Sequence, residues 1–189
     1  MSDRIFEDRR TALEEAFFAK QNAELLQKLR ESEQKSTSRG ALSLASGITD
    51  EAVLDEVLAL GVSAETWAAF SIAPLVLVAW ADGDIQLQER AAVLAGAEKA
   101  GIMPGDTAHA LLDQWLAEAP GPALLNAWKA YTAALTAQMT PTARGALRQS
   151  MLAQTEKVAD AAGGILGLGN RISAPERAVM QDMAGAFGD

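Results

Sequence analysis

The sequence predicts an all-helical protein, and three observations support that fold class. Apolar residues make up 49% of the 189 residues, enough for a core, whereas aromatic residues make up only 5%. Ala and Leu are abundant and favour close helix packing over a β-sandwich. Runs of alternating apolar and polar residues, typical of strands, do not occur. We expect a compact bundle of about seven helices, because capping residues and helix stops recur regularly. A turn that occurs twice in the chain, described below, suggests internal pseudo-symmetry in this bundle.

A long charged helix is expected before this bundle. Residues 3–35 hold 15 of the 41 acidic and basic residues and contain neither Gly nor Pro. The pattern fits either a solvated helix lying on its own domain or an arm that associates with another protein or a second copy of the chain. Residues 36–48 are rich in Ser, Thr and Gly at their start and are expected to form a linker. The predicted organisation is therefore an arm over 1–35, this linker, and a helical domain over 49–189.

The first helices of that domain follow from capping residues and a proline. Thr49 is expected to cap a helix over residues 50–60 that stops at Gly61. The next helical segment contains Pro74, which is expected to kink it or to divide it near Ser71, because proline cannot donate a helix hydrogen bond.

Caps and first-turn prolines mark the remaining helices. The expected ranges are 87–100, 107–118 after Asp106, 122 to about 138, 141 to about 162, and a last helix opened by Ser173. Two of them have clear core faces, which are Leu87, Val93, Leu94 and Ala97 in the first, and Val179, Met180, Met183 and Phe187 in the last.

An acidic turn precedes the helix expected over 87–100. Its carboxylates come from Asp82, Asp84 and Glu89. Gly83 permits a positive φ that would fold the two Asp side chains around one point. Carboxylate oxygens are the ligands that Ca²⁺ and Mg²⁺ prefer, although the spacing is not that of an EF-hand. Further ligands would have to come from elsewhere in the chain or from water.

The glutamates of these turns also have a purely structural interpretation. In a capping box, a Glu three residues after the N-cap accepts a hydrogen bond from the N-cap amide. Ser173 and Glu176 fit that spacing well, and Gln86 and Glu89 fit it loosely because Gln is a poor cap. Capping and cation binding are both open, and they are compatible if only the Asp pair faces a metal.

The turn has a weaker second copy near the end of the chain. Ile85 lies four residues before Glu89, and Ile172 lies four residues before Glu176. The second copy is poorer in acids, since Asn170 occupies the place of a carboxylate. Two such turns suggest that carboxylates from distant parts of the chain gather around one point.

The first turn is also the basis of a family resemblance. The run Val78-Ala79-Trp80-Ala81-Asp82-Gly83-Asp84-Ile85, followed by Glu89-Arg90, resembles the tellurite-resistance TerB-like family, and Ile172-Ser173-Ala174-Pro175-Glu176 resembles the second half of that family's pattern. The resemblance covers about residues 65–189. It implies a compact helical domain whose two halves bring acidic turns together at a divalent-cation site. By position it assigns Asp82, Asp84, Glu89 and Glu176 to that site.

Composition excludes several other classes of function. The chain has no Cys, which removes disulfides, thiolate nucleophiles and zinc sites built on Cys. Its net charge is −9 without a long basic run, so nucleic acid is a poor partner. The longest apolar run, residues 68–81, is interrupted by Ser71 and Pro74 and is too short to span a bilayer. With no secretory signal pattern, we expect a cytoplasmic protein.

Catalysis has little support in the sequence. His109 is the single histidine and lies on an expected helix among apolar residues, which favours a partly buried or surface histidine over a general base. No nucleophile motif occurs, and the glycine-rich run over 163–169 lacks the Lys-Ser/Thr ending of a phosphate loop. We therefore expect no enzyme and no organic cofactor, and a metal-dependent hydrolase is the least favoured hypothesis.

Two functional hypotheses remain. The first is a non-enzymatic module that binds Ca²⁺, Mg²⁺ or Mn²⁺ at its acidic turns and acts as an interaction or signalling component in a stress or envelope-associated response. Its protein partner, or a second copy in a homo-oligomer, would be bound through residues 3–35. The alternative is a metal-free interaction scaffold in which the turns are structural and the first helix drives association.

Overall fold

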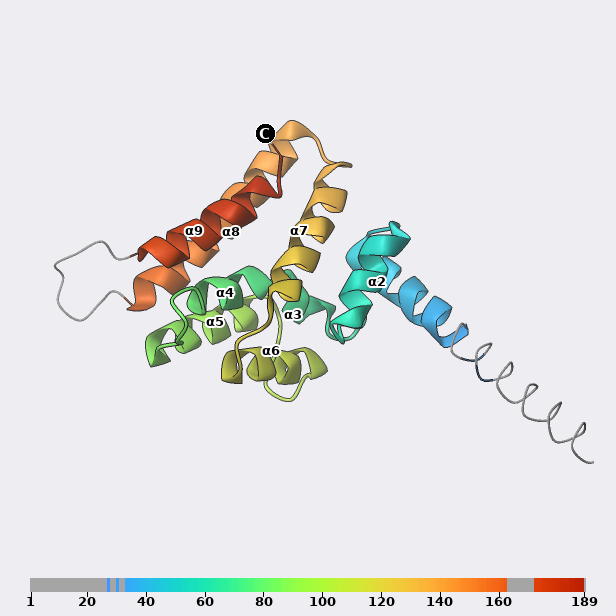
Figure 1. Cartoon of the computed structure of the whole chain (residues 1–189), viewed down its shortest axis with the longest axis horizontal. Coiled ribbons are helices and arrows are strands. Elements are labelled where there is room, and N and C mark those ends of the chain that lie inside the picture. Colours follow the sequence, from blue (N-terminus) through green and yellow to red (C-terminus); the bar gives the residue numbers. More distant parts are fainter. Residues whose placement is uncertain (1–26, 28–29, 31–32, 163–171, 189) are drawn as a thin grey trace, which may run out of the picture. The chain divides into compact units, whose positions relative to one another are not determined.

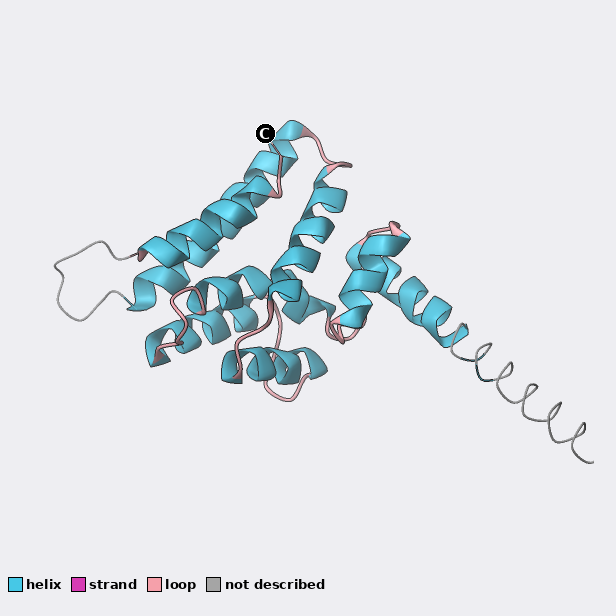
Figure 2. Cartoon of the chain, viewed as in Figure 1, coloured by secondary structure: helices cyan, strands magenta, loops and turns pink. Residues whose placement is uncertain are grey.

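The computed structural model describes residues 27, 30, 33–162 and 172–188. All regular secondary structure in these residues is helical, and no strand occurs among them (Figure 2). The prediction of an all-helical fold is confirmed. The chain divides into two compact units, residues 1–40 and residues 41–189. The charged helix expected over 1–35 lies almost wholly outside the described residues, and so does Asn170.

The described part of the second unit contains eight complete helices (Figure 1). Their bounds are α2 Glu51–Ala59, α3 Trp67–Ser71, α4 Ala73–Ala79, α5 Leu87–Lys99, α6 Thr107–Ala117, α7 Pro122–Thr136, α8 Pro141–Ala162 and α9 Ala174–Gly185.

Pro74 explains why this described part has eight helices and not about seven. Pro74 is the second residue of α4, and α3 ends three residues before Pro74, at Ser71. The pyrrolidine ring has no N–H and restricts the residue before it, so the predicted segment divides into two short helices. The sequence therefore predicted the position of this break correctly.

Residues 33–46 are helical where the sequence predicted a linker over 36–48. The hydroxyl of Thr37 donates to the backbone carbonyl of Glu33 at 2.9 Å, so this polar side chain is satisfied within a helix. Further along, Leu42 and Ile48 are buried in the core of the second unit. Leu42 lies inside this helix, and its burial favours the helix despite the low helix propensity of the Ser, Thr and Gly residues before it.

The first cap is one residue later than predicted. Asp50, not Thr49, precedes α2, and its Oδ1 accepts hydrogen bonds from the amides of Ala52 at 3.0 Å and Val53 at 3.2 Å. A carboxylate at the N-cap also interacts favourably with the positive end of the helix dipole. The predicted stop is confirmed, because Gly61 has a φ of +76° directly after the helix.

The core face predicted for α5 is correct except at its first residue. Val93 and Ala97 are buried and Leu94 is partly buried, but Leu87 is 83% exposed. Leu87 is the first residue of the helix, before the chain reaches the packed surface, and periodicity alone does not show that. The inward face predicted for α9 is correct, since Met180, Met183 and Phe187 are buried and Val179 packs against the core.

The short helix α4 lies at the centre of the second unit. It packs against α5, α7, α8 and α9, and six of its seven residues are buried. The pair α8 and α9 runs side by side (Figure 1), and α5 also packs on α8. The two helical pairs, α4 with α5 and α8 with α9, therefore pack on one another. Each pair contains one of the two turns identified in the sequence.

No helix in the described ranges has both the length and the apolar character that crossing a bilayer requires.

Candidate functional site

The start of α5 places Glu89 in the protein interior. Gln86 is the N-cap in an extended conformation, and its amide donates a 2.8 Å hydrogen bond to Oε2 of Glu89. Glu89 is only 1% exposed, although it follows an exposed turn. A buried carboxylate needs hydrogen bonds to offset its lost hydration, and the N-cap amide supplies one of them.

The start of α9 repeats this arrangement. Oγ of Ser173 accepts a 3.3 Å hydrogen bond from the amide of Glu176, and the amide of Ser173 donates in return to Oε2 of Glu176. Glu176 is 4% exposed. The reciprocal pair is a capping box, so the capping interpretation of the sequence is correct for both glutamates.

The structure brings these two glutamates together. The carboxyl groups of Glu89 and Glu176 are within hydrogen-bonding reach of one another. Each uses one oxygen to cap its own helix, and the contact is made across the packed helical pairs. Carboxylates from the two ends of the repeated pattern therefore meet at Glu89 and Glu176, whereas residues 163–171, which include most of the second turn, lie outside the described residues.

Crowding of negative charge and burial change the acidity of Glu89. Burial is the largest cause and raises the pKa of its carboxyl above 4.5, because the charged form loses hydration. The hydrogen bond from the Gln86 amide opposes this and lowers the pKa. The charges of Asp82 and Glu176, and the hydrogen bond with Glu176, raise it further. The net direction is upward, so Glu89 holds its proton at a higher pH than an ordinary glutamate.

The aspartates of the first turn remain at the surface. Asp82 and Asp84 are both exposed, and the amide of Asp84 donates to Oδ1 of Asp82 at 3.3 Å. Gly83 between them has a φ of +94°, as predicted, and its amide closes a turn onto the Trp80 carbonyl at 3.0 Å. Among the residues that the structure describes, no group of three or more acidic or histidine side chains is gathered closely enough to hold a metal ion. The four predicted ligands thus divide into a buried pair and two exposed aspartates, of which Asp82 is near enough to act on Glu89.

Two side chains beside the site, not singled out as functional from the sequence, fix the first turn to α6. The indole N–H of Trp80 donates to the Trp115 carbonyl at 2.8 Å. Arg90 donates to the Leu116 carbonyl and to Oδ1 of Asp113, both at 3.1 Å. Arg90 belongs to the repeated sequence pattern and Trp80 to the run that carries the family resemblance, but their partners are distant in the chain, so only the structure identifies these contacts.

His109 belongs to the same support. Its Nδ1 lies 2.9 Å from Oδ2 of Asp113, the carboxylate that also binds Arg90. The side chain is 18% exposed, which agrees with the predicted partly buried histidine. The carboxylate that His109 contacts is therefore the one that holds Arg90, and not a carboxylate of the glutamate pair.

Comparisons of the chain with protein-family models, with curated proteins and with solved structures give no match.

Proposed function

We propose that the protein is a non-enzymatic helical module that binds one divalent cation between its two turns. The observation that carries the proposal is the meeting of Glu89 and Glu176 in the interior, with the charge of Asp82 close by. Two carboxylates that share one buried position repel each other when both are ionised. A divalent cation removes that repulsion, and it replaces the proton that otherwise neutralises one of the two groups.

The ligands available to the ion follow from the geometry. Oε2 of each glutamate accepts the amide of its own N-cap, so the remaining oxygens of Glu89 and Glu176 are the ones that face the ion. Asp82 is exposed and held only by its own turn at 3.3 Å, so a rotation of its side chain brings in a third carboxylate. Water completes the coordination. Mg²⁺ and Mn²⁺ suit a site with few protein ligands, since Mg²⁺ keeps several waters, whereas Ca²⁺ needs six to eight oxygens.

Asp84 is the least constrained of the four proposed ligands. It is exposed, and only its backbone amide takes part in the turn. We expect it to contribute through its charge or through a bound water. The resemblance to the TerB-like family supports the same assignment, and with it a role in a stress or envelope-associated response.

Calorimetric titration with Ca²⁺, Mg²⁺ and Mn²⁺ tests the proposal. We expect saturable binding of one ion by the wild type, and loss of binding in Glu89→Gln combined with Glu176→Gln. Glutamine keeps the size of each side chain and its capping acceptor, so the double variant still folds. The matched control is Glu56→Gln, an exposed glutamate of α2, which should bind as the wild type does. The absence of saturable heat with all three ions ends the cation proposal.

A metal-free interaction scaffold is the second candidate function. The observation in its favour is that both glutamates already have a capping role, and that no three-carboxylate cluster exists among the described side chains. In this proposal the buried pair is a structural contact that shares a proton, and the charged residues 3–35 bind a protein partner or a second copy of the chain.

Light scattering separates the two candidates. The mass of residues 1–189 is compared with that of residues 33–189, a truncation that keeps the whole helical stretch over 33–46. A larger oligomer for the full chain alone, together with no cation binding, supports the scaffold. Equal monomeric masses and equal partner capture for both proteins remove the proposed role of residues 3–35.

A further inference from the structure

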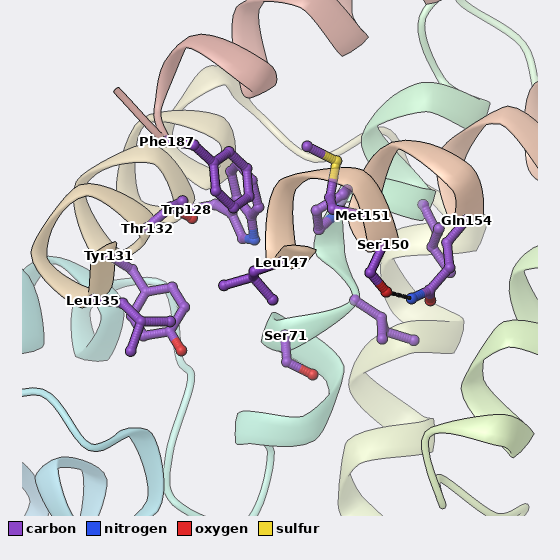
Figure 3. A pocket seen from close by; sticks show the side chains of 13 residues that line it. Ser71, Trp128, Tyr131, Thr132, Leu135, Leu147, Ser150, Met151, Gln154 and Phe187 are labelled. Atoms are coloured by element: carbon purple, nitrogen blue, oxygen red, sulfur yellow. Dashed lines mark hydrogen bonds between the residues drawn. The ribbon is translucent and has the colours of Figure 1, made fainter. Parts of the chain in front are cut away.

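A cavity of about 170 Å³ lies between α4, α7 and α8 (Figure 3), and neither Glu89 nor Glu176 lines it. Its floor is buried and mainly apolar, formed by side chains that include Trp128, Met151 and Phe187. Its rim contains the exposed polar residues Ser71 and Ser150. An apolar floor under a polar rim is typical of a ligand site, in which few polar groups fix the orientation of the ligand.

Two aromatic residues of this cavity have polar atoms without a protein partner. The indole nitrogen of Trp128 points toward Leu147 in Figure 3, and no described residue accepts its hydrogen bond. Likewise, no hydrogen bond of the Tyr131 hydroxyl occurs within the described ranges, and burial raises the pKa of this phenol. Buried Trp and Tyr normally find a partner for their polar atom. Because Trp128 and Tyr131 line the cavity, their polar atoms are available to a molecule that binds there.

A groove of about 680 Å³ continues from the cavity along α5 and α8. The cavity and the groove share part of their walls, and the shared residues are Ser71, Ile72, Leu75, Ser150 and Gln154. The groove is lined by Lys99 near the end of α5 and by Lys157 on α8, and no acidic side chain lines either space.

Two lysines line this groove, although the protein as a whole is acidic. Both side chains are exposed, and neither has a carboxylate partner among the described residues, whereas the protein as a whole carries a net charge of −9. Lys129 on α7 shows the contrasting case, because it is paired with Asp182. Two ammonium groups that have no carboxylate partner among the described residues, next to an apolar cavity, attract a negative group that carries an apolar tail.

We propose that this continuous site binds a small amphipathic anion, with its apolar tail in the cavity beside Trp128 and its carboxylate or phosphate at Lys99 and Lys157. A cavity of this size holds a tail of about six to eight carbons, since a comparable apolar cavity of about 150 Å³ binds benzene. This site is separate from the proposed cation site, and its residues take no part in it.

The test uses the full chain and a homologous series of probes: hexanoate, octanoate and decanoate, with octyl phosphate, octanol and octylammonium. The readout is the indole N–H resonance of Trp128 in a ¹H–¹⁵N spectrum, assigned by its loss in Trp128→Phe. We expect octanoate and octyl phosphate to shift this resonance saturably, and octylammonium to bind most weakly. Affinity should rise about fourfold for each methylene until the cavity is full, and then level off.

Substitutions test separately how much the apolar tail and the anionic headgroup contribute to binding. Lys99→Gln and Lys157→Gln should each weaken octanoate about two- to fivefold, because exposed charge pairs are weak, and should leave octanol unchanged. Lys129→Gln is the matched control and should bind as the wild type does. Leu147→Trp should fill the cavity and abolish binding of every probe, with circular dichroism confirming that the variant folds.

Three results would overturn the inference. The first is a Trp128 resonance that none of the probes moves. The second is binding of octylammonium as tight as that of octanoate, which would make the cavity a general apolar pocket. The third is binding by residues 33–189 but not by the full chain, which would assign the site to an N-terminal segment of the protein itself.

Discussion

The carboxyl groups of Glu89 and Glu176 are within hydrogen-bonding reach of one another, although one belongs to the start of α5 and the other to the start of α9. Because each glutamate is held by its own N-cap amide, the contact is between two fixed helix ends. It joins two helical pairs, α4 with α5 and α8 with α9, that are far apart from each other in the sequence. The same two glutamates therefore connect the helices of the second unit and form the centre of the candidate site.

The raised pKa of Glu89 predicts how stability depends on pH in the metal-free protein. In the unfolded chain the carboxyl has its ordinary pKa near 4.5, and in the folded protein burial and neighbouring carboxylates raise it. Between these values the folded state binds more protons, so the free energy of unfolding falls as pH rises from about 4.5 through the folded pKa. Chemical denaturation in the presence of EDTA, repeated from pH 4 to pH 8, measures this dependence.

The matched variant in this series is Glu89→Gln, in which the contribution of this group to the pH dependence should disappear. Glu56→Gln on the exposed face of α2 should keep the wild-type curve. If cation binding is correct, a saturating divalent ion should restore the stability of the wild type at pH 7 and 8 but not that of Glu89→Gln. If the free energy of unfolding depends on pH in the same way for the wild type and for Glu89→Gln, the assignment of the proton to Glu89 is contradicted.

The capping box at α9 predicts a second measurable loss. Ser173→Ala removes the acceptor for the Glu176 amide, which lies at 3.3 Å, and should lower the free energy of unfolding by about 1 kcal/mol. Ser150→Ala, on the exposed face of α8, should change it by less than about 0.5 kcal/mol. Urea denaturation of both variants gives the comparison. Equal stabilities for the two would show that the cap contributes nothing measurable.

Replacing either of two glycines with alanine should change the free energy of unfolding, but in opposite directions at the two positions. Gly83 has a φ of +94° in the acidic turn, where a Cβ is strained, and Gly83→Ala should destabilise the protein by about 1–2 kcal/mol. Gly145 lies inside α8 with open space around it, and Gly145→Ala should stabilise by up to about 1 kcal/mol because alanine favours the helix. Thermal unfolding of each variant checks the signs, and a Gly83→Ala protein as stable as the wild type would remove the requirement for a positive φ.

Much of the helical fold could be predicted from local signals. The break near Ser71, the starts at Pro122 and Pro141 and the cap at Ser173 were all predicted correctly, because each depends on a residue whose backbone or side chain restricts its own neighbourhood. One error was local, since the cap of α2 is Asp50 and not Thr49, and the other errors occurred where tertiary contacts decide the outcome. Residues 33–46, for example, are helical although they contain several Ser and Thr residues. Leu42 within this helix is buried, and local propensity does not predict that burial.

The candidate site was predictable only in part, for the same reason. Spacing identified Glu89 and Glu176 as capping residues, and a repeated pattern suggested that their turns would meet. Spacing could not show that the two glutamates are buried together while Asp84 stays exposed, since this depends on how two helical pairs pack. The cavity beside Trp128 had no signal in the sequence, because an apolar residue that lines a cavity and one that packs in the core give the same helical pattern, and Trp128 is itself a core residue.

The hydrogen bond from Trp80 to the Trp115 carbonyl predicts that its removal lowers the free energy of unfolding. At 2.8 Å it is the direct link between the residue after α4 and the end region of α6, and Trp80→Phe removes the donor while keeping most of the apolar contact. The loss should be about 1 kcal/mol or more, because a partly buried carbonyl is left without this partner. Tyr131→Phe is the matched control, because it also deletes one polar atom from an aromatic side chain. No hydrogen bond of the Tyr131 hydroxyl occurs among the described residues. Its loss should therefore lower the free energy of unfolding by no more than about 0.5 kcal/mol. Denaturant unfolding of both variants decides the point, and a Tyr131→Phe protein that loses as much as Trp80→Phe would show that the loss reflects packing and not the bond between Trp80 and Trp115.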